Sequence, residues 1–216
     1  MSGSDHDLEN GHRADAERAY SPGSCRGERS LSGFRYLPSP HADDRPAGSR
    51  LDLVVVHAIS LPPGEFAVHR VDELFLGRLD PEAHPYFREI AGLRVSAHFL
   101  VARCGDVTQY VPVQRRAWHA GASQWRGRSS CNDFSVGIEL SGDEVTPFTP
   151  AQYLTLARLQ RTLKKRHPSL HDDHVAGHQH IAPGRKWDPG PCFDWDFFKE
   201  CLAKATPDDH WPIVWK

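Results

Sequence analysis

The sequence has no apolar run that approaches the ~18 consecutive residues a membrane-spanning helix needs. It also has little excess charge, because 26 Lys and Arg residues stand against 28 Asp and Glu residues, a formal net charge of −2. The lack of a basic excess argues against a protein whose main task is to bind nucleic acid. Residues 1–20 contain no apolar segment of the kind found in secretory signals, so we expect a cytoplasmic protein.

The cysteines also lack the spacing typical of a disulfide framework or a zinc site. The five cysteines are odd in number and form no Cys-x-x-Cys pair. Both facts favour reduced thiols over a disulfide framework, and the spacing does not support a thiolate zinc site. Histidine, in contrast, is abundant, with 14 residues. Because imidazole is a common metal ligand, this abundance makes a metal site worth seeking.

The chain divides into three parts. Residues 1–30 are polar and nearly free of large apolar side chains, so we predict a disordered N-terminal extension. Residues 31–204 carry the apolar patterns of strands interleaved with helices, which predicts one α/β or α+β domain with a mixed sheet. Residues 205–216 are a C-terminal tail.

Two segments are predicted as central strands. Residues 51–57 become apolar on both faces after Asp52 and end at His57, which is typical of a strand in the middle of a covered sheet. Residues 134–140 alternate, and one set of side chains is small or polar and ends in Glu139, as in a strand that borders a cleft. The core set is Val136, Ile138 and Leu140, and the cleft set is Ser135, Gly137 and Glu139.

The remaining elements are predicted from caps and turns. A helix should begin at Thr149 with Pro150 in its first turn, end at His167, and bury Tyr153, Leu156, Leu159 and Leu163. We also expect helices over 82–93 and 194–202 and a hairpin of 96–102 with 107–111. The pair Arg115–Arg116 is interpreted as a solvated surface.

Residues 177–191 form a loop-like segment dense in functional groups. If it is extended around Lys186 and Asp188, their side chains enter one space, because residues two apart point the same way. His57 and Glu139, at the ends of the two strands, complete a set of imidazoles, carboxylates and one ammonium.

This set of groups suits zinc-dependent amide hydrolysis. A catalytic zinc site has three protein ligands and one open position. The remaining carboxylate could then carry a proton and the ammonium could stabilise the oxyanion. Residue types alone leave open which of the histidines take part. Taken singly, His57 could be a hydrogen-bonded core histidine, Glu139 a solvated carboxylate, and Lys186 the partner of Asp188 in a surface ion pair.

Five stretches resemble the AmpD family of cytoplasmic 1,6-anhydro-N-acetylmuramyl-L-alanine amidases. They are VVVHAISLPPGEF (54–66), LDPEAHPYFREIAGLRVSAHFLV (79–101), QYVPVQRRAWHAG (109–121), CNDFSVGIEL (131–140) and GHQHIAPGRKWDPGPCFDW (177–195). They occur in family order and cover most of residues 31–202. The resemblance implies a zinc amidase with a mixed sheet flanked by helices, as in peptidoglycan recognition proteins.

The resemblance also implies roles for individual residues. It assigns zinc binding to His57, His178 and Asp188, proton transfer to Glu139, oxyanion stabilisation to Lys186, and substrate binding to Arg94 and His119. Two positions depart from the family. Ala58 stands where the family typically has Asn, and Ser130 stands where some members have an arginine that contacts the stem peptide.

The expected activity is therefore hydrolysis of the amide bond between anhydro-N-acetylmuramic acid and L-alanine in cytoplasmic muropeptides during peptidoglycan recycling. We expect Zn²⁺ as cofactor, a small-molecule substrate, no nucleic-acid or membrane partner, and a monomer. Two alternatives stay open: a muropeptide-binding module without catalysis, and a lytic amidase that acts on polymeric murein.

Overall fold

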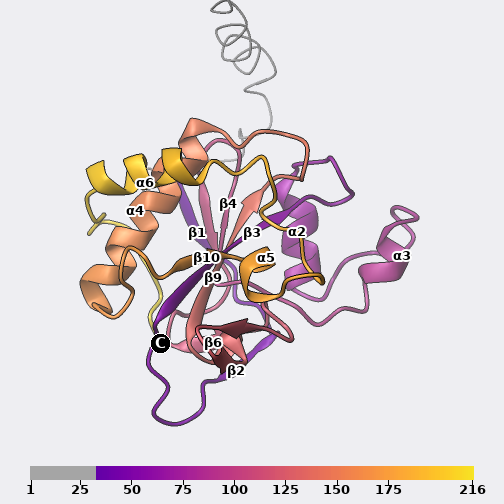
Figure 1. Cartoon of the computed structure of the whole chain (residues 1–216). Coiled ribbons are helices and arrows are strands. Elements are labelled where there is room, and N and C mark those ends of the chain that lie inside the picture. The colour runs from indigo at the N-terminus through magenta and orange to yellow at the C-terminus, as the bar shows by residue number, and fades with distance from the viewer. Residues whose placement is uncertain (1–32) are drawn as a thin grey trace, which may run out of the picture.

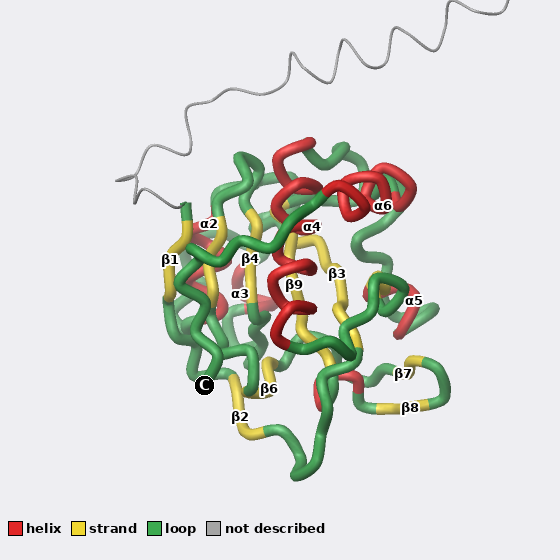
Figure 2. The backbone as a smooth tube through the Cα atoms, turned by 90° about the vertical axis from the view of Figure 1, so that its left-hand side faces the viewer, coloured by secondary structure: helices red, strands yellow, loops and turns green. Residues whose placement is uncertain are grey.

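A six-stranded mixed sheet forms the centre of the computed structural model, which describes residues 33–216. The predicted disordered extension, residues 1–30, lies outside the described residues. The strand order is β1-β5-β4-β9-β3-β10 (Figures 1 and 2). The strands are β1 (Phe34–Tyr36), β3 (Leu53–Ile59), β4 (Phe99–Val101), β5 (Val107–Gln109), β9 (Ser135–Ser141) and β10 (Val175–Gly177).

The two long strands lie side by side in the sheet. β3 pairs in parallel with β9 on one side and with β10 on the other, which confirms the prediction that it has neighbours on both sides. β4 pairs in parallel with β9 and antiparallel with β5, so the predicted hairpin is present. The register places His57 opposite Glu139. Because paired residues on adjacent strands point to the same face of a sheet, these two side chains lie on one face.

One face of the sheet is covered by two helices, α4 (Pro150–Arg166) and α6 (Trp195–Lys204), which pack together (Figure 1). The four apolar residues predicted for α4 are all buried, and they join the core set of β9 in one apolar cluster. Thr149 caps α4 with a capping box to Gln152, and the Asp194 side chain accepts hydrogen bonds at the start of α6. Both helices therefore begin where the sequence predicts.

The opposite face carries α2 (Val68–Phe75), α3 (Phe87–Ile90) and the loops that surround the carboxyl ends of β3 and β10. Two small antiparallel pairs lie in these loops, formed by β2 (Ala42–Asp44) with β6 (Arg115–Ala117) and by β7 (Gln124–Trp125) with β8 (Arg128–Ser129). The 3₁₀ turn η1 (Cys131–Asp133) leads into β9, and α5 (His178–Ile181) follows β10 directly. Within residues 33–216, no helix combines the length and apolar character that a bilayer crossing requires.

The helix predicted over 82–93 is much shorter in the structure. Only Phe87–Ile90 is helical, because a turn at Asp80 accepts the Glu82 backbone N–H with its side chain. Pro85 then lacks the N–H that a continuous helix would need at that position. The prediction of a helix over the whole of 82–93 was therefore wrong in extent.

The C-terminal tail packs against the domain. Ile213 is buried in the main apolar cluster, and Trp211 contacts the ring of Phe34 at a centroid distance of 6.1 Å. The Gln109 side chain pairs with Val214, donating to its carbonyl at 2.7 Å and accepting from its N–H at 2.8 Å. The tail thus packs on the side of the sheet that carries α4, near β1 and β5.

Candidate metal centre

Two histidines reach one point from neighbouring parallel strands. His57 lies near the carboxyl end of β3, and His178 is the residue that follows β10. Gly177 pairs with Val56, so the two histidines leave the sheet at the same level. The carboxyl ends of parallel strands are where open α/β sheets form their binding sites.

Asp188 arrives at the same point from the loop after α5. The Gln179 backbone N–H donates to the Asp188 carbonyl at 2.8 Å, and the Gln179 side-chain oxygen accepts from the Gly190 N–H at 2.9 Å. Gly177 leaves room for this loop, since a Cβ there would lie 2.7 Å from Pro189 Cδ. The position of Asp188 is therefore fixed by the helix that begins with His178.

The three side chains form a tight, buried triangle, here called the metal centre. The Nδ1 atoms of His57 and His178 are 3.0 Å apart, and Asp188 Oδ2 lies 3.0 Å from the first and 3.1 Å from the second. All three residues are buried. Among residues 33–216, this is the group of histidine, cysteine and acidic side chains that converges closely enough to hold a metal ion.

The contacts of His57 show where its proton lies. The Ser135 hydroxyl donates to the Cys131 carbonyl at 2.6 Å, so its oxygen can only accept from His119 Nε2, 3.2 Å away. Burial lowers the pKa of His119 well below its ordinary value, so the ring is neutral and His119 Nδ1 accepts. It accepts from His57 Nε2 at 2.9 Å. Burial also lowers the pKa of His57, to about 4, so the ring is neutral and its Nδ1 carries a lone pair.

His178 has the same tautomer for a different reason. Its Nε2 lies 3.1 Å from the Ala120 carbonyl oxygen, which can only accept, so the proton is on Nε2. Asp188 Oδ2 faces both Nδ1 atoms, and a carboxylate, the ordinary form of an aspartate at neutral pH, can only accept. Three acceptor atoms therefore face one another with no hydrogen between them.

Such an arrangement requires a cation. Zinc binds imidazole nitrogen and carboxylate oxygen at about 2.0–2.2 Å, so two ligands of a tetrahedral ion lie about 3.3 Å apart. The observed separations of 3.0–3.1 Å are close to that spacing. Two neutral imidazoles and one carboxylate fit the three protein ligands of a catalytic zinc site.

Glu139 lies beside the metal centre on β9, in register with His57. Its Oε2 atom is buried and has no hydrogen-bond partner among the described residues. Burial raises its pKa well above the ordinary value, the charge of Asp188 adds to this, and the charge of Lys186 opposes it. The structure thus places next to the metal centre a carboxyl group poised to bind a proton.

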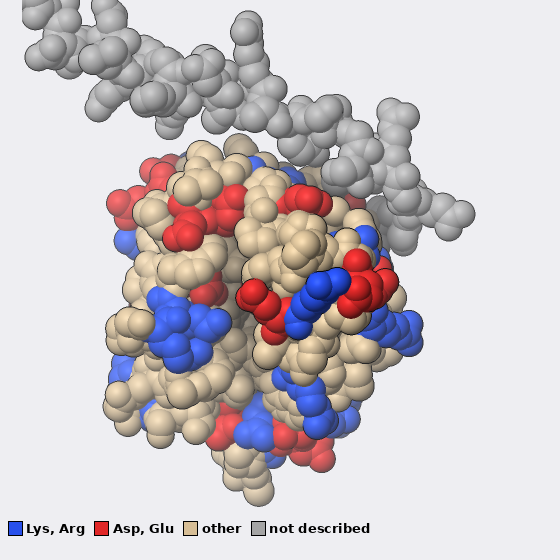
Figure 3. Space-filling view, turned by 90° about the vertical axis from the view of Figure 1, so that its right-hand side faces the viewer, with Lys and Arg blue, Asp and Glu red and all other residues tan. Residues whose placement is uncertain are grey.

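The other two basic residues expected at the site are exposed. Lys186 lies on the loop that leads to Asp188, close enough for its charge to lower the pKa of Glu139 and His57. Arg94 lies over the ring of Trp118, with Cζ 5.3 Å from the ring centroid. On the face where α3 lies, basic and acidic side chains are interspersed around a furrow in the surface (Figure 3).

His119, Ala58 and Ser130, which the sequence also singled out, lie in three different environments. His119 has both ring nitrogens occupied, by His57 and Ser135, and its role in substrate binding stays a prediction. Ala58 packs in the apolar cluster under α4, on the opposite side of β3 from His57. Ser130 is exposed and has a left-handed backbone conformation with φ of 61°.

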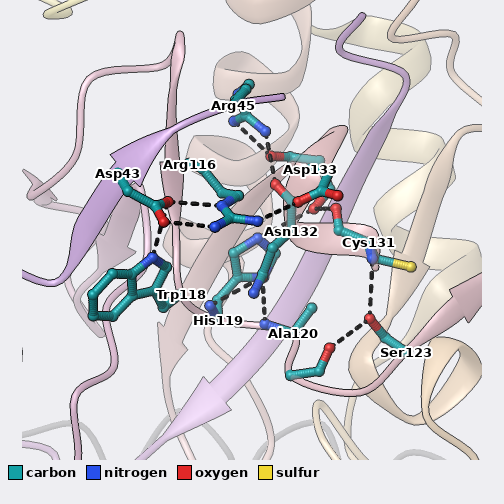
Figure 4. Close-up of polar contacts among 12 residues, drawn as sticks. Asp43, Arg45, Arg116, Trp118, His119, Ala120, Ser123, Cys131, Asn132 and Asp133 are labelled. Carbon is teal, nitrogen blue, oxygen red and sulfur yellow. Dashed lines mark hydrogen bonds and ion pairs between the residues drawn. The ribbon is translucent and has the colours of Figure 1, made fainter. Parts of the chain in front are cut away.

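Sequence reasoning missed a cluster of charges next to the metal centre, here called the arginine cluster. Arg116 donates to Asp43 at 2.7 Å and to Asp133 at 2.6 Å, and the Trp118 indole donates to Asp43 at 3.0 Å (Figure 4). The interpretation of Arg116 as part of a solvated surface was therefore incomplete, since its side chain is partly exposed and also bound by two carboxylates. Asp43 is 73 residues away in the sequence, so no local pattern could have identified the pair.

Comparison with known proteins supports these observations. The sequence profile of the N-acetylmuramoyl-L-alanine amidase family matches residues 47–191, a range that contains the whole metal centre. The 1,6-anhydro-N-acetylmuramyl-L-alanine amidase AmpD of Escherichia coli strain K12 is 53% identical over 176 residues, which cover 82% of this chain and 96% of that protein.

Solved structures agree with the fold. A crystal structure of a selenomethionine derivative of AmpD has a TM-score of 0.76 at 52% identity and covers 80% of this chain and 96% of that one. Escherichia coli AmiD in complex with the substrate anhydro-N-acetylmuramic acid-L-Ala-D-γ-Glu-L-Lys has a TM-score of 0.52 at 28% identity, covering 73% of this chain and 60% of that one. The predicted α/β domain with a mixed central sheet is confirmed.

Proposed function

Because this chain belongs to the N-acetylmuramoyl-L-alanine amidase family, we propose that it is a zinc-dependent hydrolase of peptidoglycan recycling in the cytoplasm. Its substrate is a soluble muropeptide, and the bond cut is the amide between anhydro-N-acetylmuramic acid and L-alanine. The relatives that match almost the whole domain carry this substrate in their names. The observation that supports the zinc dependence most directly is the set of three mutually facing acceptor atoms in the metal centre.

His57, His178 and Asp188 would hold the ion. When bound, zinc supplies a Lewis acid that polarises a carbonyl and makes water acidic enough to attack near neutral pH. The buried walls around the three ligands keep bulk water away from them. In such a site, fixed charges and dipoles act more strongly than they would in water.

Glu139 is proposed as the group that moves the proton. It accepts a proton from the attacking water on its unpaired Oε2 atom and delivers it to the leaving amide nitrogen. The raised pKa suits this role, because a carboxyl group of ordinary pKa would hold the proton too weakly to pass it on. The register with His57 keeps the carboxyl group beside the reacting carbonyl.

The basic residues would act on negative charge. Lys186 is proposed to stabilise the oxygen that becomes negative during the attack, since its charge already acts on Glu139 and His57. Arg94 is proposed to bind an acidic group of the muropeptide, with its guanidinium held over Trp118. His119, half-buried beside His57, is proposed to contact the substrate.

The test is to incubate the purified, zinc-loaded protein with an anhydro-muropeptide and to analyse the products by mass spectrometry. The expected products are anhydro-N-acetylmuramic acid and the free stem peptide. Bound but uncleaved muropeptide would instead support the binding module. The same assay is repeated with murein sacculi, because loss of turbidity at a matching rate would support a lytic amidase.

A matched control separates metal dependence from general damage. Removal of the metal with a chelator should abolish cleavage, and added Zn²⁺ should restore it. Cleavage that persists after the metal content has fallen to background would contradict the proposed zinc dependence.

A further inference from the structure

Two adjacent residues contact the two histidines of the metal centre at Nε2, the ring nitrogen that does not face Asp188. His119 Nδ1 faces His57 Nε2 at 2.9 Å, and the Ala120 carbonyl oxygen faces His178 Nε2 at 3.1 Å. We propose that the dipeptide His119–Ala120, fixed by Asn132, is an outer shell that sets the tautomer of both histidine ligands. His119 and Asn132 are thus positioning residues for the metal centre, an inference that rests on the proposed function.

The contact on the His57 side is a chain of hydrogen bonds with one direction. It starts at the Cys131 carbonyl, which only accepts, and runs through the Ser135 hydroxyl and the His119 ring to His57. Each group along the chain has one hydrogen to give, so reversing a single bond would leave two hydrogens or two lone pairs in conflict. The chain therefore keeps the hydrogen of His57 on Nε2 and its Nδ1 lone pair free for the metal.

The contact on the His178 side is made by backbone. The Ala120 carbonyl accepts from His178 Nε2 and also from the Arg185 guanidinium, at 3.1 and 2.6 Å. A carbonyl oxygen has two lone pairs, so it can accept both bonds. Because a backbone carbonyl never donates, this contact favours the Nε2–H tautomer of His178 irrespective of the side chain at position 120, against the longer approach of the Arg185 guanidinium to the same nitrogen at 3.4 Å.

Asn132 holds this dipeptide in place. Its side-chain oxygen accepts from the backbone N–H groups of His119 and Ala120, at 3.2 and 2.8 Å (Figure 4). The Asn132 carbonyl in turn accepts from the Arg45 guanidinium at 2.8 Å. One side chain therefore fixes both residues that contact the histidine ligands.

The position of the His119 ring also explains why residue 137 of β9 is a glycine. A Cβ atom at Gly137 would lie 2.5 Å from His119 Cγ, a separation that the packed ring could not accept. The three cleft-facing residues of β9 thus have distinct tasks. Ser135 accepts from His119, Gly137 makes room for its ring, and Glu139 lies beside His57.

The experiment compares two nearly isosteric variants, His119→Asn and His119→Leu. Asparagine can place its side-chain oxygen where Nδ1 of the histidine accepts from His57, whereas leucine of the same shape cannot. The readout is the zinc dissociation constant, measured by competition with a chromophoric chelator. We expect His119→Leu to weaken zinc binding about 10–100-fold, and His119→Asn to recover most of that loss. Equal affinities in the two variants would overturn the proposal, because they would show that the ring acts by packing alone.

A second measurement requires neither zinc nor a substitution of His119. Long-range ¹H–¹⁵N NMR spectra of the metal-free protein near neutral pH should show Nε2–H tautomers for both His57 and His178. The milder variant Ser135→Ala should shift His57 towards a mixture of tautomers and leave His178 unchanged, since only the His57 side uses the serine. A predominant Nδ1–H form of His57 in the wild-type protein would overturn the proposal.

These readouts also separate this inference from the proposed function. If zinc affinities and tautomers behave as expected but no muropeptide is cleaved, the outer shell stands and the proposed hydrolysis fails. If muropeptide is cleaved and both variants bind zinc like the wild-type protein, the proposed function stands and the outer shell is refuted.

Discussion

The segment 116–120 links two polar clusters, since Arg116 and Trp118 belong to one and His119 and Ala120 contact the other, and the two clusters balance their charges in opposite ways. In the arginine cluster, one guanidinium lies between the carboxylates of Asp43 and Asp133, so the chain itself supplies the cation. The metal centre brings together one carboxylate and two imidazole lone pairs, and with both ring hydrogens on Nε2 none of these three groups donates to another. The first cluster is complete as folded, whereas the second needs an ion from solution.

The two clusters also differ in burial. The arginine cluster is partly exposed. Water therefore solvates its charges, and it also limits how much their ion pairs contribute to the stability of the fold. The metal centre is buried, where acceptors without donors are costly. Metal binding should therefore stabilise the fold, because the folded chain presents the ligands already assembled and the unfolded chain does not.

The strongest test of this contrast is removal of one ligand, with His178→Ala. The expected zinc content falls from about one ion per chain to near zero, because three protein ligands are the usual minimum of a catalytic zinc site. Amide hydrolysis should fall below detection. Elemental analysis after gel filtration measures the metal, with the exposed His171→Ala as control. Full zinc content in His178→Ala would count against its assignment as a ligand.

The next largest effect is expected from Glu139→Ala, which separates metal binding from catalysis. The ligands are untouched, so zinc content should stay at the wild-type level. The turnover number should fall about 10²–10⁴-fold, the usual contribution of a general acid–base group. Muropeptide cleavage followed by mass spectrometry measures it, and the exposed Glu89→Ala serves as control. Wild-type turnover in Glu139→Ala would refute the proposed proton transfer.

Much of the fold follows from local patterns in the sequence. The capped helix from Pro150 and the two long strands could be predicted because each carries its own signal, a cap in one case and a run or alternation of apolar residues in the other. The shortened helix at Phe87–Ile90 could not, because a side-chain turn and a proline override a helical pattern there. Short strands such as β2 and β6 exist only through their partners and leave no pattern of their own.

The site shows the same division more sharply. The sequence indicated the types of group at the metal centre, and family resemblance supplied which histidines take part. What neither indicated is the tautomer of each ring, because this depends on contacts between residues far apart, such as His57 with His119 and His178 with Ala120. The arginine cluster was missed for the same reason, since Arg116 looks like any surface arginine until Asp43 is placed opposite it.

A third prediction concerns His98, a buried imidazole whose partners all come from the chain. Its Nδ1 accepts from the Gly137 N–H, and its Nε2 lies 3.0 Å from the Arg115 carbonyl. Burial, together with the charge of Arg45, lowers its pKa to about 3, against about 6.5 in the unfolded chain. The unfolded state therefore binds a proton first as the pH falls, so stability is lost from about pH 6.5 downwards and the loss levels off near pH 3.

The variant His98→Gln should remove this contribution. The free energy of unfolding of the metal-free wild-type protein should fall with decreasing pH more steeply than that of the variant, by up to about 1.4 kcal/mol per pH unit between pH 6 and 4. Urea unfolding at a series of pH values measures both slopes. The exposed His69→Gln is the control, and parallel curves for His98→Gln and wild type would show that His98 is not responsible.

The smallest effect is expected where the chain supplies its own cation. The Arg116 guanidinium, hydrogen-bonded to Asp43, lowers the pKa of that carboxyl to about 2, and a second bond runs to Asp133. Replacing the arginine with Arg116→Met leaves two carboxylates without their shared cation. The cluster is partly exposed, so the loss should be only about 1 kcal/mol in the free energy of unfolding near neutral pH.

The sign with pH follows from the depressed pKa of Asp43. The stabilisation of the fold by the Arg116–Asp43 contact is fully present above the ordinary carboxyl pKa of about 4, and it is lost as the pH falls towards about 2. The destabilisation by Arg116→Met should therefore shrink in acid and in high salt. Zinc affinity should change far less than in His119→Leu, because Asn132 still holds the dipeptide that contacts the ligands. If Arg116→Met and His119→Leu weakened zinc binding equally, the two clusters would act as one unit, and the contrast between a self-balanced region and an ion-requiring one would fail.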